Sequence, residues 1–312
     1  MRPSLLALAL ALACGSPAGQ APPDGGSPGD GGPDAGGPDA GAGDAGTPDG
    51  GSLVAARPYA LHVPPSYDPA KPAPLVILLH GYGATGAQQE SYFNLTPLAD
   101  ARTFLYATPD GTLDPTGHRY WNATDACCAP RASPVDDVAY INAIIDDVER
   151  RYTVDTKRVY LVGHSNGGFM AHRLACDSAP RIAAIVSLAG AQWKDNTRCA
   201  PGAKVAVLQV HGTADGTISY TGGSTPYGPY PAASETVADW ARFNGCGSLD
   251  SSAPNLHIDS SQPPAETTVG RYTGCAGGAV ELWSIQGGGH IPLLVPEWPA
   301  LIYGFLSAHP RP

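Results

Sequence analysis

Residues 159–168 read Val-Tyr-Leu-Val-Gly-His-Ser-Asn-Gly-Gly, a short apolar strand that runs directly into a Gly-x-Ser-x-Gly turn. An amphipathic, helix-like run follows at residues 169–175, so the turn has the strand–turn–helix context of a nucleophile elbow. Glycine is required at Gly163 and Gly167 because a Cβ there would collide with the neighbouring strand or helix. The stretch therefore predicts an α/β fold and makes Ser165 the candidate nucleophile.

Two residues that match this chemistry follow predicted strands further along the chain. Asp215 lies in the loop after the buried-strand pattern 205–210, and His290 follows the pattern 280–285 and a glycine loop. A serine hydroxyl needs a base whose pKa lies near neutrality, and a carboxylate orients that base and stabilises its charged form. The order Ser165, Asp215, His290 predicts a catalytic triad.

Two backbone amides are expected to stabilise the oxyanion that develops during acyl transfer. One is the N–H of Asn166, the residue after the nucleophile. The strand pattern 74–79 leads directly into His80-Gly81, and the residue after such a pair commonly supplies the second donor. We therefore assign the second N–H to Tyr82.

Four other residues near these motifs have alternative interpretations. His164 and His211 are interpreted as packing or hydrogen-bonding residues that take no direct part in catalysis. Trp121 and Tyr220 are candidates for lining a substrate cleft, and simple packing is an equally good reading. Their roles stay open at the level of the sequence.

The apolar patterns predict alternating strands and helices, hence a mainly parallel sheet with helices on both faces. Asp136 and Asp137 stand at the start of one predicted helix, where they favour capping and a stabilising interaction with the helix dipole. The expected strands are 58–63, 75–80, 103–108, 158–163, 182–188, 205–210, 267–273 and 279–285, and the expected helices are 135–151, 167–176, 232–244 and 297–308.

Together these motifs resemble the secreted esterases of the polyhydroxybutyrate depolymerase and feruloyl esterase group, related to carbohydrate esterase family 1. The resemblance covers roughly residues 57–309 and implies an α/β-hydrolase fold and carboxylic-ester hydrolysis through an acyl-enzyme. Many members carry a tryptophan directly after the catalytic histidine. This chain has Ile291-Pro292 there, which points to a different wall of the acyl pocket. The matching segments are His80–Gly83, Trp121 with Cys127-Cys128, Val135–Val138, Gly163–Gly168, His211–Asp215 and Gly288–His290.

The N-terminal region predicts export and tethering. Residues 1–14 have a cationic start and an apolar run too short to span a bilayer, which is typical of a signal peptide. Cleavage by a general signal peptidase and cleavage at a lipoprotein box both fit, and we favour a lipid anchor on Cys14. Residues 15–52 are rich in Gly, Pro and Asp and predict a disordered linker. The catalytic domain is then expected at 53–312.

Charge and cysteine usage agree with an enzyme outside the cytoplasm. The formal net charge of −10 disfavours nucleic-acid binding, and no cysteine spacing predicts a metal site or any cofactor. Of seven cysteines, six remain beside Cys14, an even number that suits an oxidising compartment. Spacing leaves the connectivity undetermined. The preferred pairs are Cys176–Cys199 and Cys246–Cys275, with Cys127 and Cys128 either a vicinal bridge or free thiols.

Three function classes follow from these observations. The first is a secreted or envelope-bound serine esterase acting on hydroxyalkanoate oligomers or related esters, with feruloyl or acetylxylan esters of plant polysaccharide as the alternative. The second is a serine peptidase of the prolyl-oligopeptidase kind, disfavoured because no large accessory domain precedes residue 53. The third is a non-catalytic surface lipoprotein. The expected partners are an ester substrate and, only through Cys14, a membrane.

Overall fold

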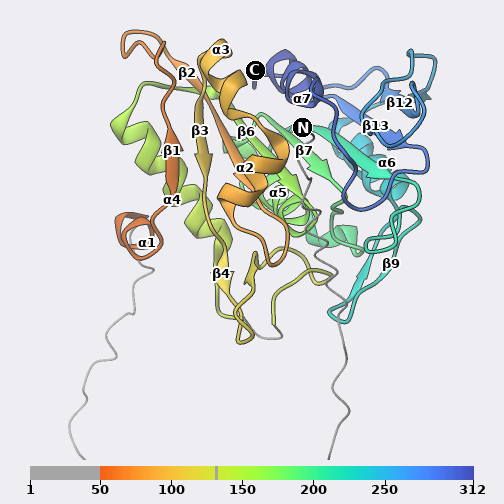
Figure 1. Ribbon diagram of the computed structural model, residues 1–312, viewed down its shortest axis with the longest axis horizontal. Helices are drawn as coiled ribbons and strands as arrows, with labels where there is room; N and C mark the ends of the chain where they lie inside the picture. Colours follow the sequence, from red (N-terminus) through yellow and green to blue (C-terminus); the bar gives the residue numbers. More distant parts are fainter. Residues whose placement is uncertain (1–49, 131–132) are drawn as a thin grey trace, which may run out of the picture. The chain divides into compact units, whose positions relative to one another are not determined.

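A central nine-stranded sheet organises the protein (Figure 1). The computed structural model describes residues 50–130 and 133–312, so the predicted signal segment, Cys14 and most of the predicted linker lie outside the described residues. Across the sheet the strand order is β1-β3-β2-β6-β7-β8-β13-β12-β11. In chain order these strands are β1 (Ala60–His62), β2 (Ala73–Leu79), β3 (Leu105–Thr108), β6 (Val154–His164), β7 (Ala184–Leu188), β8 (Ala206–Gly212), β11 (Leu249–Asp250), β12 (Thr267–Tyr272) and β13 (Val280–Ile285).

The middle of this sheet is parallel, as predicted. Strands β3, β2, β6, β7, β8 and β13 pair in parallel, whereas β1, β12 and β11 are antiparallel to their neighbours. Because the carboxyl ends of parallel strands meet at one edge, the loops after β2, β6, β8 and β13 open on the same side of the sheet. Two small hairpins stand outside it, β4 (Thr112–Leu113) with β5 (Arg119–Tyr120) and β9 (Gly223–Ser224) with β10 (Pro229–Tyr230).

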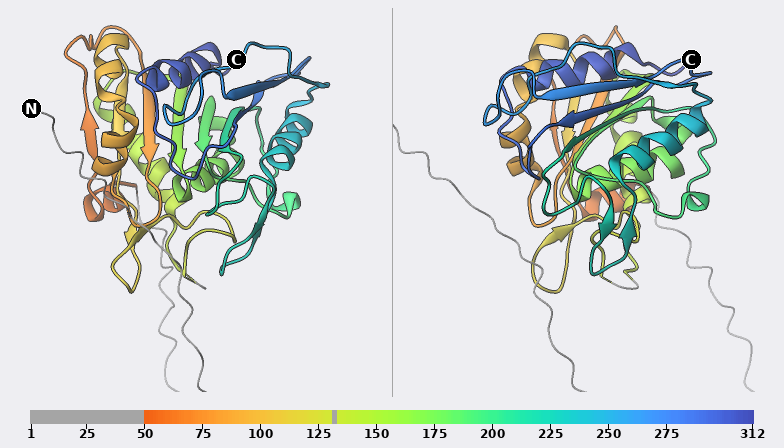
Figure 2. Two further views of the ribbon diagram at one scale, coloured as in Figure 1. Left: turned by 45° about the vertical axis from the view of Figure 1, so that its right-hand side comes forward. Right: turned by 90° about the vertical axis from the view of Figure 1, so that its right-hand side faces the viewer.

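Helices cover both faces of the sheet (Figure 2). Alternate side chains of strand β2 pack on opposite faces of the sheet. Leu75 and Ile77 belong to one buried cluster, and Val76 and Leu78 belong to the other. Each such aliphatic side chain contributes roughly 1.5–3 kcal/mol by leaving water. One face carries α2 (Gly86–Phe93), α3 (Thr96–Arg102) and α7 (Trp298–Ala308), and the other carries α1 (Gly50–Ala56), α4 (Asp137–Arg151), α5 (Asn166–Asp177) and α6 (Ala233–Asn244).

The two aspartates predicted at the start of α4 have different roles in the structure. Asp136 is the N-cap and accepts the Ala139 N–H at 2.9 Å, as expected. Asp137 is fully buried and pairs with Arg57 at 2.7 Å, while its second oxygen accepts the N–H of Asn122 at 2.7 Å. Burial raises the pKa of Asp137 even though Arg57 opposes that shift. Asp137 therefore forms a buried ion pair, and its role is not limited to an interaction with the helix dipole.

Several boundaries differ from the sequence-based expectations. Helix α1 begins at Gly50, so the last residues of the predicted linker 15–52 are helical, and they are held because Leu53 and Val54 pack against the core. Helices α2 and α3 were not predicted. Strand β6 begins at Val154, earlier than the expected 158. None of the helices within the described residues is long and apolar enough to cross a membrane.

Three disulfides link the described part of the chain. Cys176 and Cys199 join the last turn of α5 to the loop after β7, and Cys246 and Cys275 join the residue beyond the cap of α6 to the β12–β13 turn. Cys127 and Cys128 are bonded to each other, which is the first of the two states that the sequence left open.

Candidate active site

Ser165 occupies a tight turn between β6 and α5. Its backbone lies at φ 54° and ψ −121°, and its N–H donates to the Leu188 carbonyl at 2.8 Å. A positive φ is unusual for a residue with a Cβ and stores strain. Only glycine fits on either side, because a Cβ on Gly163 would lie 2.1 Å from Gly167 O and one on Gly167 would lie 2.1 Å from Leu79 O. The turn has the geometry of the predicted elbow.

The structure brings Ser165, Asp215 and His290 together. The Nε2 atom of His290 lies 2.9 Å from Ser165 Oγ, and its Nδ1 lies 2.8 Å from Asp215 Oδ2. A carboxylate can only accept, so Nδ1 carries the proton and Nε2 is free to accept the serine hydroxyl. The three residues follow β6, β8 and β13, at the shared carboxyl edge of the sheet.

Asp215 is buried but stays ionised. Its Oδ1 accepts the N–H groups of Thr217 and Ile218 at 2.8 and 2.9 Å, and its Oδ2 faces both His290 and His211. Burial alone would raise the pKa of Asp215, but hydrogen bonds from His211, His290 and the Ile218 amide outweigh it and hold the pKa well below the usual range. The side chain therefore presents a fixed negative charge to His290.

Backbone hydrogen bonds join the loops that carry Asp215 and His290. Thr213 N–H donates to Ile285 O and Ala214 N–H donates to Gly288 O, both at 2.9 Å. The loops approach so closely that a Cβ on Gly212 would lie 2.2 Å from Gly288 O. These contacts hold Asp215 and His290 in a fixed position relative to each other.

The segment that follows His290 is held from the nucleophile side of the site. His164 is buried, and burial lowers its pKa to about 3, so the ring is neutral and its Nε2–H donates to His290 O at 3.0 Å. Tyr92, from α2, donates its hydroxyl to Pro292 O at 2.7 Å. The hydrogen-bonding interpretation of His164 fits this arrangement. Tyr92 was not foreseen, because nothing in its local sequence marks it.

The predicted oxyanion donors lie beside Ser165. Asn166 is the first residue of α5, where N–H groups lack intrahelical acceptors. The Gly81 carbonyl accepts from His80 Nδ1 at 2.8 Å, and because a trans peptide directs its C=O and N–H oppositely, the Tyr82 N–H points away from His80. A Cβ on Gly81 would lie 3.5 Å from the Cβ of Ser165, so this peptide borders the nucleophile.

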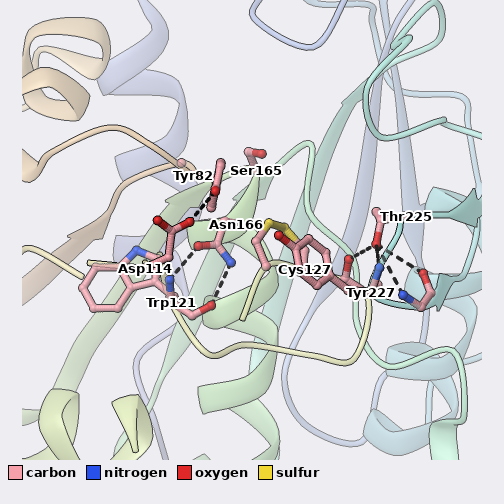
Figure 3. The surroundings of a disulfide bond; sticks show 12 residues. Tyr82, Asp114, Trp121, Cys127, Ser165, Asn166, Thr225 and Tyr227 are labelled. Carbon is pink, nitrogen blue, oxygen red and sulfur yellow. Dashed lines mark hydrogen bonds between the residues drawn. A yellow bond between two sulfur atoms is a disulfide. The ribbon is translucent and has the colours of Figure 1, made fainter. Parts of the chain in front are cut away.

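Asn166 also anchors the neighbouring loop through its side chain (Figure 3). Its Oδ1 accepts the Trp121 N–H at 2.7 Å, and its Nδ2 donates to Trp121 O at 3.0 Å. Trp121 itself is fully buried, and its indole N–H donates to His80 O at 3.0 Å. The expectation that Trp121 lines a substrate cleft is therefore wrong, and the packing alternative holds, because the indole is buried against His80.

Tyr82 and the disulfide of Cys127 lie near Ser165 in Figure 3. Tyr82 donates its hydroxyl to Asp114 at 2.5 Å, and Tyr227 lies beside the disulfide of Cys127. The Tyr220 hydroxyl lies 2.8 Å from Ser284 Oγ, and the Tyr220 ring packs at right angles to the ring of His211. Substrate contact by Tyr220 stays a prediction.

The site contains few other groups that could assist chemistry. No cluster of three or more His, Cys, Asp or Glu side chains suited to a metal ion occurs in residues 50–130 and 133–312. Two apolar side chains close to His290 are unusually exposed, Ile291 at 57% and Leu293 at 61%.

Comparison with known proteins identifies the family of the chain. The family described as Phospholipase/Carboxylesterase matches residues 66–237, more than half of the 312 residues. The chain belongs to this carboxylesterase family. It is 30% identical over 272 residues to the putative esterase NocK of Nocardia uniformis subsp. tsuyamanensis, covering 81% of this chain and 73% of NocK.

One further relative and one solved structure are also similar to this chain. The chain is 29% identical over 237 residues to feruloyl esterase B of Piromyces equi, which covers 73% of this chain but only 41% of that protein. The solved structure of an acetyl xylan esterase from Aspergillus awamori superposes with a TM-score of 0.55 at 16% identity, covering 78% of this chain and 93% of the other, and shows the shared fold. The protein is thus a carboxylic-ester hydrolase with an α/β-hydrolase fold, as the resemblance implied.

Proposed function

We propose that Ser165, His290 and Asp215 form the catalytic triad of this esterase. The observation that carries the proposal is the continuous hydrogen-bonded path from Ser165 Oγ through His290 to the buried Asp215 carboxylate, with distances of 2.9 and 2.8 Å. Ser165 Oγ attacks the ester carbonyl carbon while its proton passes to His290 Nε2, and Asp215 stabilises the resulting imidazolium.

The oxyanion of the tetrahedral intermediate would be held by the N–H groups of Tyr82 and Asn166, each worth about 3 kcal/mol of transition-state stabilisation. When the intermediate collapses, the carbonyl–alkoxy bond breaks and His290 gives its proton to the departing alcohol. Water then attacks the acyl-enzyme, with His290 again acting as the base, and Ser165 is regenerated.

We propose feruloyl or acetyl esters of plant polysaccharide as the substrate class, with hydroxyalkanoate oligomers as the second candidate. Relatives of this chain include proteins named feruloyl esterase and bifunctional acetylxylan esterase/xylanase, which supports the first class. The exposed apolar side chains Ile291 and Leu293 next to His290 favour the second, because they offer a surface for an aliphatic polyester.

The proposed location is outside the cytoplasm. Three disulfides among the described residues support an oxidising compartment. We also propose an export signal at 1–14, a lipid anchor on Cys14, a linker rich in Gly, Pro and Asp, and a catalytic domain that follows it. Fractionation tests it: Cys14→Ser should move the enzyme from the detergent phase to the medium with unchanged turnover, whereas an unmodified Cys14 thiol in wild-type protein would remove the anchor.

The triad is tested with p-nitrophenyl acetate. Ser165→Ala should abolish hydrolysis while the circular dichroism spectrum and melting temperature stay close to wild type. Asp215→Asn and His290→Ala should each be severely impaired and add little to Ser165→Ala, because triad members act as a unit. More than a few per cent residual activity in Ser165→Ala would place the nucleophile elsewhere.

Methyl ferulate, acetylated xylan and hydroxybutyrate oligomers, assayed side by side, then decide the substrate class.

A further inference from the structure

A row of buried polar side chains leads from helix α6 to Asp215. Its members are Trp240 on α6, His172 on α5, and Gln209 and His211 on β8. None of the four is more than 1% exposed. Polar groups buried this deeply are costly unless they are hydrogen-bonded, and here each one is bonded to the next.

The direction of the first two hydrogen bonds is fixed by chemistry. An indole N–H can only donate, so the contact of 3.0 Å between Trp240 Nε1 and His172 Nδ1 makes Nδ1 an acceptor. The proton of neutral His172 then resides on Nε2, which donates to Gln209 Oε1 at 2.9 Å. Burial lowers the pKa of His172 to about 4, in agreement with a neutral ring.

The same logic continues to His211. With its oxygen facing His172, Gln209 directs its amide nitrogen to Gly190 O at 2.8 Å and to His211 Nδ1 at 3.1 Å. His211 Nδ1 is therefore an acceptor, and its proton lies on Nε2. That N–H faces Ile218 O at 2.8 Å and Asp215 Oδ2 at 3.3 Å.

We propose that His211 is a positioning residue for the triad, which holds the Asp215 carboxylate against His290 and whose ring is oriented by Gln209 and by the Ile218 carbonyl. The proposal rests on the proposed function, because Asp215 affects catalysis only through His290. With Oδ1 held by two backbone amides and Oδ2 shared between His290 and His211, the carboxylate has no freedom to rotate. A side chain that only filled space would not supply this donor.

The proposal predicts a signature in the pH profile. The titratable side chains that face the acid–base pair are His211 behind Asp215 and His164 behind His290. If the His211 N–H is removed, the negative charge of Asp215 is less well compensated and favours the protonated form of the acid–base pair more strongly. The acid limb of kcat/KM should then move upward, and kcat should fall because the carboxylate is less well oriented.

Two amide substitutions separate the donor from the rest of the ring. In His211→Gln the amide nitrogen reaches the position of Nε2 and can still donate towards Asp215, whereas the amide of His211→Asn lies near the position of Nδ1 and cannot. We expect His211→Asn to lower kcat about tenfold with KM within twofold, and to raise the acid limb by about 0.5 pH unit. His211→Gln should stay within threefold of wild type.

Gln209→Met supplies a second variant, in case His211→Asn does not fold. It leaves His211 in place but removes the hydrogen bond to Nδ1 that orients the ring, so we expect a three- to tenfold loss of kcat and the same direction of pH shift. Asn244→Ala is the matched control: its buried amide donates to Val205 O at 2.7 Å, at the opposite end of β8. It should lose stability without any change in kcat or in the acid limb.

The outcomes distinguish the two proposals. Labelling by a fluorophosphonate, located by mass spectrometry, tests Ser165 independently of His211. If Ser165 is labelled but His211→Asn and His211→Gln have equal kcat and equal pH profiles, the positioning role is refuted and the triad stands. If the His211 variants do not fold, a wild-type kcat and acid limb in Gln209→Met refute it equally. If Ser165 is not labelled in wild type, the proposed function fails.

Discussion

Arg57→Met should destabilise the esterase strongly, although Arg57 lies outside the triad. Its guanidinium pairs at 2.7 Å with Asp137, whose side chain is 0% exposed, and lies 3.8 Å from the centre of the Tyr140 ring. Methionine keeps the apolar stem but removes the charge. The variant leaves an interior carboxylate whose remaining close donor is the Asn122 N–H.

The size of the effect follows from these contacts. Removing one partner of a buried ion pair costs roughly 3–5 kcal/mol, and a close cation–π contact adds about 1 kcal/mol. We therefore expect the free energy of unfolding to fall by about 4 kcal/mol at pH 8. The folded-state pKa of Asp137 is already raised and would rise further, so the folded state binds the extra proton. The penalty should grow as pH increases and be smaller at pH 5.

Urea unfolding monitored by tryptophan fluorescence measures this loss, and a double-mutant cycle isolates the pair. In an Asp137→Asn background, Arg57→Met should cost only about 1 kcal/mol, because no buried charge is left unpaired. A penalty of the same size in both backgrounds would show that Arg57 stabilises the fold by packing alone. A wild-type urea midpoint for Arg57→Met would refute the reasoning outright.

Three further predictions test the elbow, a buried carboxylate and the oxyanion site. Gly167→Ala should prevent accumulation of folded enzyme, since its Cβ would lie 2.1 Å from Leu79 O, whereas Gly289→Ala, with nothing within 4 Å, should fold normally by circular dichroism. Burial would raise the pKa of Glu266, but backbone and side-chain hydrogen bonds hold it at about 2. Glu266→Gln should therefore cost about 3 kcal/mol at pH 7 in urea melts, a difference that disappears as pH falls from 4.5 to 2. Tyr82→Phe should keep kcat for p-nitrophenyl acetate within threefold, because the proposed donor is the backbone N–H; a hundredfold loss would assign the role to the hydroxyl.

The sheet and the placement of the three candidate catalytic residues could be predicted because their signals are local. Continuous apolar runs mark buried parallel strands, and Gly-x-Ser-x-Gly requires a backbone that few other sequences adopt. Helix α2 was missed because it is short and not clearly amphipathic, although Thr85 and Gln88 form a capping box that the sequence displayed.

The remaining features depend on distant contacts. Trp121 could not be assigned correctly from the sequence, since its burial results from packing against His80 and pairing with Asn166. Likewise, the hydrogen bond between His172 and Gln209 joins a helix to a strand, and no spacing along the chain reveals it. Tertiary packing determines such roles, and local sequence patterns do not predict it.

The loops that carry Asp215 and His290 are held together without any contribution from the β9–β10 hairpin. The hydrogen bonds described above that fix Asp215 and His290 come from residues 211–218, from residues 285–290 and from His164, so the hairpin of β9 and β10 contributes none of them. That hairpin instead contacts the loop of the vicinal disulfide, where the Thr225 hydroxyl donates to Ala126 O. We therefore expect that these two surface segments can be exchanged as a matched set without loss of the hydrogen bonds that join Ser165, His290 and Asp215.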